Sequence, residues 1–216
     1  MGGSRRVLTT WRCEGFTNFG QNFALKPITK GRPLDQVTAG SDIERVVATH
    51  DQIIGRLKEL ARQIEKDYAG RDLLLIGVLK GAVMTMADFA RQLNRHVEMD
   101  WMAVSSYGSG TKSSGVVRIL KDLDRDITGR EVLIIEDIVD TGLTLAWLKS
   151  NLESRGAKSV AILTMLRKPE AAKVQVEVKY VGFDIPTDFV VGYGLDFNEK
   201  YRNLDFIGVL AKHMYS

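Results

Sequence analysis

A strand-like apolar run that leads directly into acidic residues constrains the fold of this chain more than any other feature. The run Val132–Ile135 has the β-branched composition of a strand buried on both faces. It stops at two adjacent acids and leads through the polar turn 136–144 into the amphipathic run Leu145–Leu148. The order strand, turn and helix start predicts an α/β sheet, in which ligands bind at the carboxyl ends of strands.

This turn combines groups that attract an anion with groups that repel one. Backbone N–H groups of Thr141–Thr144, at the start of a helix, can hold a phosphate. The carboxylates of Glu136, Asp137 and Asp140 stand beside them. An ordinary structural turn needs only one capping Asp or Thr. The three acids indicate a ligand that carries phosphate, vicinal hydroxyls and Mg²⁺.

Composition indicates one globular domain that acts on small molecules. The chain has 216 residues, 44% hydrophobic and 26% charged, and no apolar run long enough to span a bilayer. A net charge of +3 suits anionic substrates and does not by itself indicate nucleic acid. The single cysteine, Cys13, favours a reducing compartment. We therefore expect a cytoplasmic protein with no nucleic-acid or membrane partner.

Hydrophobic periodicity predicts alternating helices and strands after residue 50. The predicted helices span 51–68, 83–93 and 143–155, and the predicted strands span 73–79, 99–105, 116–120, 132–135, 159–166, 178–183 and 206–210. This alternation predicts a central, mostly parallel sheet flanked by helices. Residues 1–40 mix Gly, Arg, Thr and isolated aromatics without periodicity. We expect them to form a disordered or loosely packed N-terminal extension, and residues 41–216 to form the domain.

The turn resembles the phosphoribosyl-pyrophosphate signature of the type I phosphoribosyltransferases. The form Glu-Asp-Ile-Val-Asp-Thr-Gly-Leu-Thr is similar to that of the hypoxanthine-guanine branch. The resemblance runs from about Val46 to Leu210, with the family's motifs in the expected order. It implies the type I phosphoribosyltransferase fold, with a small hood formed by the terminal segments, and a homodimer or homotetramer.

The resemblance also implies a role for each residue of the signature. The phosphoribosyl group would be bound by Glu136, Asp137, Ile138, Val139, Asp140, Thr141, Gly142, Leu143 and Thr144. Glu136 and Asp137 would take the two ribose hydroxyls and, together with Asp196, would hold Mg²⁺. Asp140 would be the catalytic residue that relays the N7 proton of the purine.

Two further loops are similar to elements of the same family. Leu79-Lys80-Gly81 follows a strand and is similar to the pyrophosphate-binding loop, in which the Leu-Lys peptide can be cis. Taken alone, a Lys-Gly turn is as easily structural. Arg202 would also reach the pyrophosphate. Composition alone predicts that residues 105–115 form a mobile hairpin loop, whereas the resemblance implies a lid in which Ser106 and Tyr107 close over the reacting centre.

The C-terminal region would bind the purine. Lys168 would donate to a 6-oxo group, Phe189 would stack on the base, and the Val190 backbone would read its Watson–Crick edge. Asp196, the third residue that the resemblance implies for holding Mg²⁺, belongs to the same purine-binding region.

The reaction implied by the resemblance is purine salvage. Phosphoribosyl would pass from phosphoribosyl pyrophosphate to hypoxanthine or guanine, giving IMP or GMP and pyrophosphate. Two alternatives remain: a phosphoribosyl-pyrophosphate-sensing regulatory protein of the same fold, and a xanthine-preferring phosphoribosyltransferase. A regulator should carry a basic face or a DNA-binding extension, which the sequence lacks. The sequence does not separate hypoxanthine, guanine and xanthine.

Overall fold

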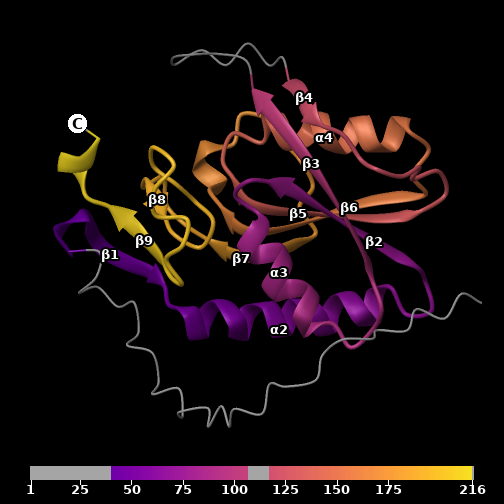
Figure 1. The fold of residues 1–216 in the computed structure, drawn as a ribbon, viewed down its shortest axis with the longest axis horizontal. Helices are drawn as coiled ribbons and strands as arrows, with labels where there is room; N and C mark the ends of the chain where they lie inside the picture. The colour runs from indigo at the N-terminus through magenta and orange to yellow at the C-terminus, as the bar shows by residue number, and fades with distance from the viewer. Residues whose placement is uncertain (1–39, 107–116, 216) are drawn as a thin grey trace, which may run out of the picture. The chain divides into compact units, whose positions relative to one another are not determined.

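A six-stranded sheet forms the centre of the part of the chain that the computed structural model describes, residues 40–106 and 117–215 (Figure 1). Its strands lie in the order β4-β3-β2-β5-β6-β7. They are β2 (Leu73–Leu79), β3 (Glu98–Ser106), β4 (Val117–Lys121), β5 (Glu131–Val139), β6 (Ser159–Arg167) and β7 (Tyr180–Asp184). Neighbours pair in parallel except β4, which is antiparallel to β3. The predicted mostly parallel sheet is confirmed.

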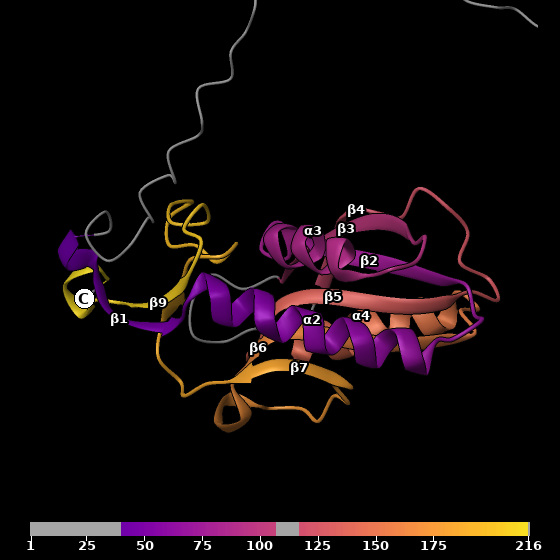
Figure 2. The ribbon, with the colours of Figure 1, turned by 90° about the horizontal axis from the view of Figure 1, so that it is seen from below.

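Helices lie on both faces of this sheet (Figures 1 and 2). Alternating side chains of the central strands pack against them. Leu133 and Ile135 of β5 belong to one hydrophobic cluster, which includes α2 (His50–Asp67) and α3 (Val83–Gln92). Val132 and Ile134 belong to a second cluster, which includes α4 (Leu143–Ser154). All four side chains are fully buried. Burial on both faces explains why this stretch of sequence is continuously apolar.

Helix α2 shows how local signals set an element's ends. The Thr49 side chain accepts the N–H of Gln52, and the Gln52 side chain accepts the N–H of Thr49. This capping box starts the helix one residue earlier than predicted. Most other boundaries differ from the predictions by one or two residues. None of the described helices is long and apolar enough to cross a membrane.

A second, three-stranded sheet forms the hood. Its strands are β1 (Ile43–Ala48), β8 (Val190–Val191) and β9 (Ile207–Leu210), in the antiparallel order β1-β9-β8. This sheet lies to one side of the main sheet (Figure 1). The hood is built from both ends of the described region, as the family resemblance implied. Local periodicity did not predict β1, because its partner β9 lies at the other end of the chain. Residues 1–39 lie outside the described part, so the predicted extension stays a prediction.

Candidate active site

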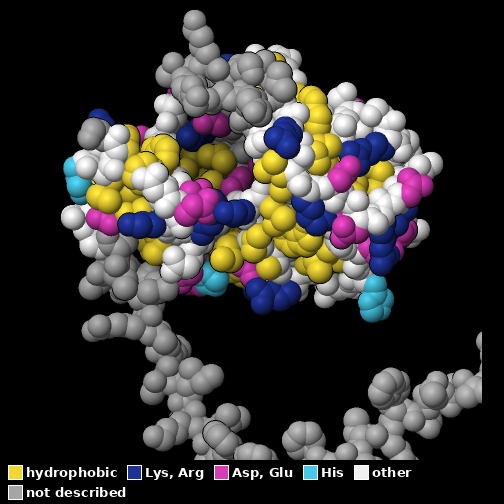
Figure 3. Space-filling view, turned by 45° about the horizontal axis from the view of Figure 1, so that its top comes forward, with side chains coloured by type: hydrophobic (Ala, Val, Ile, Leu, Met, Phe, Trp, Pro, Cys, Tyr) yellow, Lys and Arg dark blue, Asp and Glu magenta, His cyan; other side chains and the backbone are white. Residues whose placement is uncertain are grey.

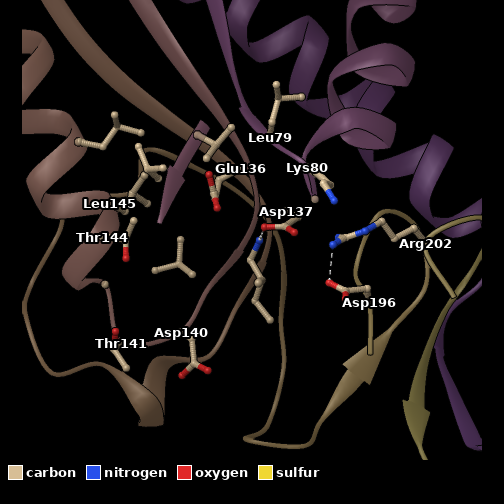
Figure 4. Close-up of a pocket in the computed structure, with 17 residues that line it drawn as sticks. Leu79, Lys80, Glu136, Asp137, Asp140, Thr141, Thr144, Leu145, Asp196 and Arg202 are labelled. Carbon is tan, nitrogen blue, oxygen red and sulfur yellow. Dashed lines mark hydrogen bonds and ion pairs between the residues drawn. The ribbon is translucent and has the colours of Figure 1, made fainter. Parts of the chain in front are cut away.

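A cavity of about 350 Å³ opens where β2 and β5 end, at the carboxyl edge of the main sheet (Figure 4). Its walls come from the loop after β2, from the end of β5 with the turn into α4, and from the loop after β8. All predicted phosphoribosyl- and pyrophosphate-binding residues line this cavity except Leu143. In the space-filling view, acidic and basic side chains lie beside one another around a hollow in the surface (Figure 3).

The two adjacent acids lie inside strand β5 rather than in the turn after it. The strand continues to Val139, and Glu136 pairs with Thr164 of β6. The prediction that the strand stops before Glu136 is therefore wrong. Pairing with β6 extends the strand past the point where its apolar composition ends. Because Glu136 and Asp137 are part of a paired strand, their backbone is held in place at the edge of the cavity.

Burial raises the pKa of both carboxyls, Glu136 and Asp137. The Glu136 Oε2 atom is shielded from solvent and has no hydrogen-bond partner among the described residues. Burial, and then repulsion from Asp137, raises the pKa of Glu136 well above its ordinary value. Burial also raises the pKa of Asp137, although the N–H of Ile138 donates to its Oδ1 at 2.7 Å. An unpartnered buried acceptor is costly, so this pair suits a ligand that brings hydroxyl donors or a cation.

The turn between β5 and α4 has the form of an anion site. Gly142 stands at the N-cap of α4 with a φ of +78°, a left-handed conformation, and has no side chain of its own to cap the helix, although the Thr141 hydroxyl accepts the N–H of Leu143 at 3.5 Å. A Cβ at Gly142 would lie 3.1 Å from the carbonyl oxygen of Val174. The start of α4, with its positive dipole end, therefore faces the cavity beside Thr141 and Thr144.

The segment that follows β6 makes backbone hydrogen bonds to this turn. The N–H of Lys168 donates to the carbonyl of Val139 at 2.9 Å. The N–H groups of Lys173 and Val174 both donate to the carbonyl of Thr141, at 3.0 and 3.3 Å. These backbone bonds hold the turn without occupying the side chains of its acids.

The loop after β2 crosses directly over Asp137. The Leu79–Lys80 peptide is cis, as the resemblance allowed. A Cβ at Gly81 would lie 1.5 Å from Asp137 Oδ2, and a Cβ at Gly194 would lie 1.9 Å from the carbonyl oxygen of Gly81. Glycine at both positions lets this loop fit between the acid pair and the loop after β8.

The loop after β8 brings an arginine to the cavity. Arg202 Nη2 lies 2.7 Å from Asp196 Oδ1, and Arg202 Nη1 donates to the carbonyl of Gly194 at 2.8 Å (Figure 4). Glu199, a residue not predicted for the site, lies 3.0 Å from Lys80 Nζ through its Oε2. The hydrogen bond from Lys80 lowers the pKa of Glu199. No local pattern could have identified Glu199, because its partner belongs to a distant loop.

A second cavity, of about 610 Å³, shares Val139, Asp140 and Gly142 with the first and extends to Lys168. The Lys168 side chain is buried, and its Nζ lies 3.7 Å from Asp140 Oδ2. The predicted purine donor and the predicted catalytic acid are therefore neighbours. The Asp140 side chain is half exposed and is accessible to a ligand.

Phe189 and Val190 line neither of these cavities. Phe189 contacts the rings of Phe197 and Tyr215, at centroid distances of 5.8 and 5.3 Å, and is 40% exposed. Val190 is buried in the hood. Their predicted contact with a purine stays a prediction.

The remaining predicted residues concern the lid and the metal. Ser106 is the last residue of β3, and Tyr107 lies outside the described residues. Within the described part of the chain, no three His, Cys, Asp or Glu side chains form a cluster that could hold a metal. Asp196 is paired with Arg202, whereas the adjacent acids Glu136 and Asp137 line the cavity without a cationic partner within ion-pair distance among the described residues.

Comparisons with known proteins agree with this architecture. Residues 46–198 match the phosphoribosyl transferase domain family. The chain belongs to the phosphoribosyltransferase family. It is 58% identical over 180 residues to a hypoxanthine-guanine phosphoribosyltransferase of Mycobacterium tuberculosis, covering 81% of this chain and 89% of the relative. The corresponding relative from Streptococcus thermophilus is 50% identical over 175 residues, which cover 81% of this chain and 97% of the relative.

Solved phosphoribosyltransferases share the fold. A hypoxanthine phosphoribosyltransferase from Staphylococcus aureus superposes with a TM-score of 0.81 at 46% identity, covering 85% of this chain and 99% of that structure. The fold and family predicted from the signature are confirmed, and the chain is a transferase. Because the cavity contains the phosphoribosyltransferase signature, it is the candidate active site of this family member.

Proposed function

We propose that this phosphoribosyltransferase transfers phosphoribosyl from phosphoribosyl pyrophosphate to hypoxanthine or guanine, releasing IMP or GMP and pyrophosphate. The observation that carries the proposal is the order of charges across the cavity (Figure 4). The positive end of α4 lies at one side, the acids Glu136 and Asp137 lie between, and the cations Lys80 and Arg202 lie at the other. A ligand with a phosphate, a diol and a pyrophosphate matches this order.

The phosphoribosyl pyrophosphate would bind along this sequence of charges. Its 5′-phosphate would accept N–H groups of the turn at Thr141–Thr144. Its two ribose hydroxyls would donate to Glu136 and Asp137, which would satisfy the unpartnered Glu136 oxygen. Its pyrophosphate would lie against Lys80, Gly81 and Arg202.

Asp140 would act as the acid–base residue of the transfer. Breaking the bond at ribose C1 develops positive charge on the ring, which nearby carboxylates stabilise. Asp140, half exposed at the junction of the two cavities, would relay the N7 proton of the purine. Ser106 and Tyr107 would exclude water from this step as a lid.

Purine choice would depend on Lys168. A buried ammonium facing position 6 satisfies an oxo group but meets the amino group of adenine donor to donor, which leaves buried groups unpaired. Phe189 would supply a stacking surface, and the Val190 backbone would read the base edge. The contacts of Phe189 with other aromatic rings leave part of its own ring exposed, where a base could stack.

Mg²⁺ fits the donors at this site. It prefers oxygen ligands and often binds one or two carboxylates together with substrate phosphates. Glu136 and Asp137 would hold it, with Asp196 at the opposite wall, and it would neutralise negative charge on the departing pyrophosphate. We further propose that the enzyme works in the cytoplasm as a homodimer or homotetramer.

A steady-state assay with phosphoribosyl pyrophosphate, Mg²⁺ and each free base tests the proposal. We expect turnover with hypoxanthine and guanine and little with adenine. Faster turnover with xanthine would assign the chain to a xanthine-preferring enzyme. Tight binding of phosphoribosyl pyrophosphate without transfer to any base would contradict the proposal and indicate a regulatory protein of the same fold.

A further inference from the structure

One carboxylate contacts both cations of the proposed pyrophosphate site. Glu199 Oε2 lies 3.0 Å from Lys80 Nζ and 3.4 Å from Arg202 Nη2. Lys80 belongs to the loop after β2, whereas Glu199 and Arg202 belong to the loop after β8. Glu199 therefore joins two loops that are distant in sequence, through two residues that line the cavity.

The backbone around Glu199 is held in conformations that non-glycine residues rarely adopt. Asn198, Glu199 and Tyr201 have φ values of +52°, +61° and +74°. The N–H of Glu199 donates to Asp196 Oδ2 at 2.9 Å, and Phe197 and Lys200 exchange backbone hydrogen bonds of 3.2 and 3.1 Å. Such strain persists only where surrounding contacts enforce it, and it concentrates at functional sites.

Glu199 holds the cations in the way that a phosphoryl oxygen would. A carboxylate and a phosphate both accept charge-assisted hydrogen bonds from Lys and Arg. We propose that Glu199 is a positioning residue that stands in for pyrophosphate: it holds Lys80 and Arg202 in the empty site and is displaced when a pyrophosphate group enters. This inference rests on the proposed function, because that function assigns pyrophosphate to these two cations.

The exposure of the pair makes this exchange possible. The Lys80 and Glu199 side chains are 66% and 64% exposed, and exposed ion pairs contribute little to stability. Pyrophosphate carries several negative charges and can outcompete one carboxylate. Glu199 also repels the bound pyrophosphate, so it lowers the affinity for this group and favours its release.

The test is direct binding of inorganic pyrophosphate to the full chain. Isothermal titration calorimetry in EDTA, without Mg²⁺, compares the wild type with Glu199→Gln, which keeps the shape and removes the charge. We expect the dissociation constant of the variant for pyrophosphate to be lower by about fivefold or more. This difference should shrink at high salt, because salt screens both the attraction of Glu199 to the two cations and its repulsion of pyrophosphate. The matched control is Glu44→Gln, which removes the same charge at an exposed position of β1 away from the cavity. Its affinity should equal that of the wild type.

The outcomes separate this inference from the function on which it rests. Tighter binding by Glu199→Gln alone supports the inference, since structural damage to the loop would weaken binding instead. Unchanged or weaker binding by Glu199→Gln overturns it, as does an equal gain in Glu44→Gln. If the wild type binds pyrophosphate yet transfers phosphoribosyl to no base, the proposed transfer fails while the titration still decides the role of Glu199. A wild type that does not bind pyrophosphate in EDTA overturns the inference, whereas the proposed transfer is decided separately by the assay with Mg²⁺.

Discussion

Gly81 stands so close to Asp137 that a Cβ at this position would lie 1.5 Å from Asp137 Oδ2. The pyrophosphate loop and the acid pair therefore occupy adjoining space with no room for a side chain between them. Hydrogen is the only substituent that lets the loop cross the acid at this distance. The loop position and the position of the acid are consequently coupled.

The first prediction concerns this contact. Gly81→Ala should displace either the loop or Asp137 and raise the KM for phosphoribosyl pyrophosphate at least about tenfold, a cost within the usual range of overpacking. Steady-state kinetics would measure it. Gly55→Ala is the matched control, because a Cβ there meets nothing within 4 Å on the exposed side of α2. It should leave the kinetics unchanged and stabilise the helix by about 0.5–1 kcal/mol. A normal KM in Gly81→Ala would show that the two elements are not coupled.

The second prediction concerns Asp140. Asp140→Asn keeps the shape of the side chain but removes the proton acceptor. We expect turnover to fall by about 10²-fold or more, with phosphoribosyl-pyrophosphate binding largely kept. Kinetics and direct ligand binding, measured on the same preparation, separate the two effects. Unchanged turnover would remove Asp140 from the mechanism.

The third prediction concerns Lys168. Lys168→Met, which removes the donor, should weaken hypoxanthine and guanine binding by roughly 1–3 kcal/mol and reduce discrimination against adenine, because the buried 6-oxo donor is lost. The KM values for the three bases provide the measurement. Lys173→Met makes the same change at an exposed lysine of the neighbouring segment and should alter none of these KM values. If both variants behave alike, the assignment of the purine site to Lys168 is incorrect.

The fourth prediction concerns Glu131, at the start of β5 and away from the cavity. The Ser159 hydroxyl, followed by Lys158 and Arg71, lowers the pKa of Glu131 from 4.5 to about 2. Because the folded-state pKa is below the unfolded one, the ionised form stabilises the protein at neutral pH, by about 3 kcal/mol. This contribution should disappear as the pH falls from about 5 towards 2.

Urea unfolding of the wild type and Glu131→Gln across this pH range tests whether the ionised Glu131 stabilises the folded protein. The wild type should be the more stable protein at pH 7, and the gap should narrow steadily towards pH 3. Glu44→Gln, at an exposed position, should show no such trend. A stability gap independent of pH would mean that Glu131 contributes by packing and not by its charge.

The sequence by itself determined the local elements and the family. Helical spacing predicted the helices and short apolar runs predicted the strands, because these patterns report which faces of each element are buried. The turn after Val132–Ile135 identified the phosphoribosyltransferase signature because its acids, hydroxyls and glycine stand next to one another in the chain. Local periodicity did not indicate that β5 runs on through Glu136 and Asp137, since that extension depends on pairing with β6.

Tertiary structure alone decided which distant residues meet. The pairing of β1 with β9, the 3.7 Å approach of Lys168 to Asp140, and the bridge from Glu199 to Lys80 each join segments with no common local pattern. Phe189 lies against Tyr215 in the hood for the same reason. Periodicity records the burial of one element at a time, whereas these contacts depend on how the loops close and how whole elements pack against one another.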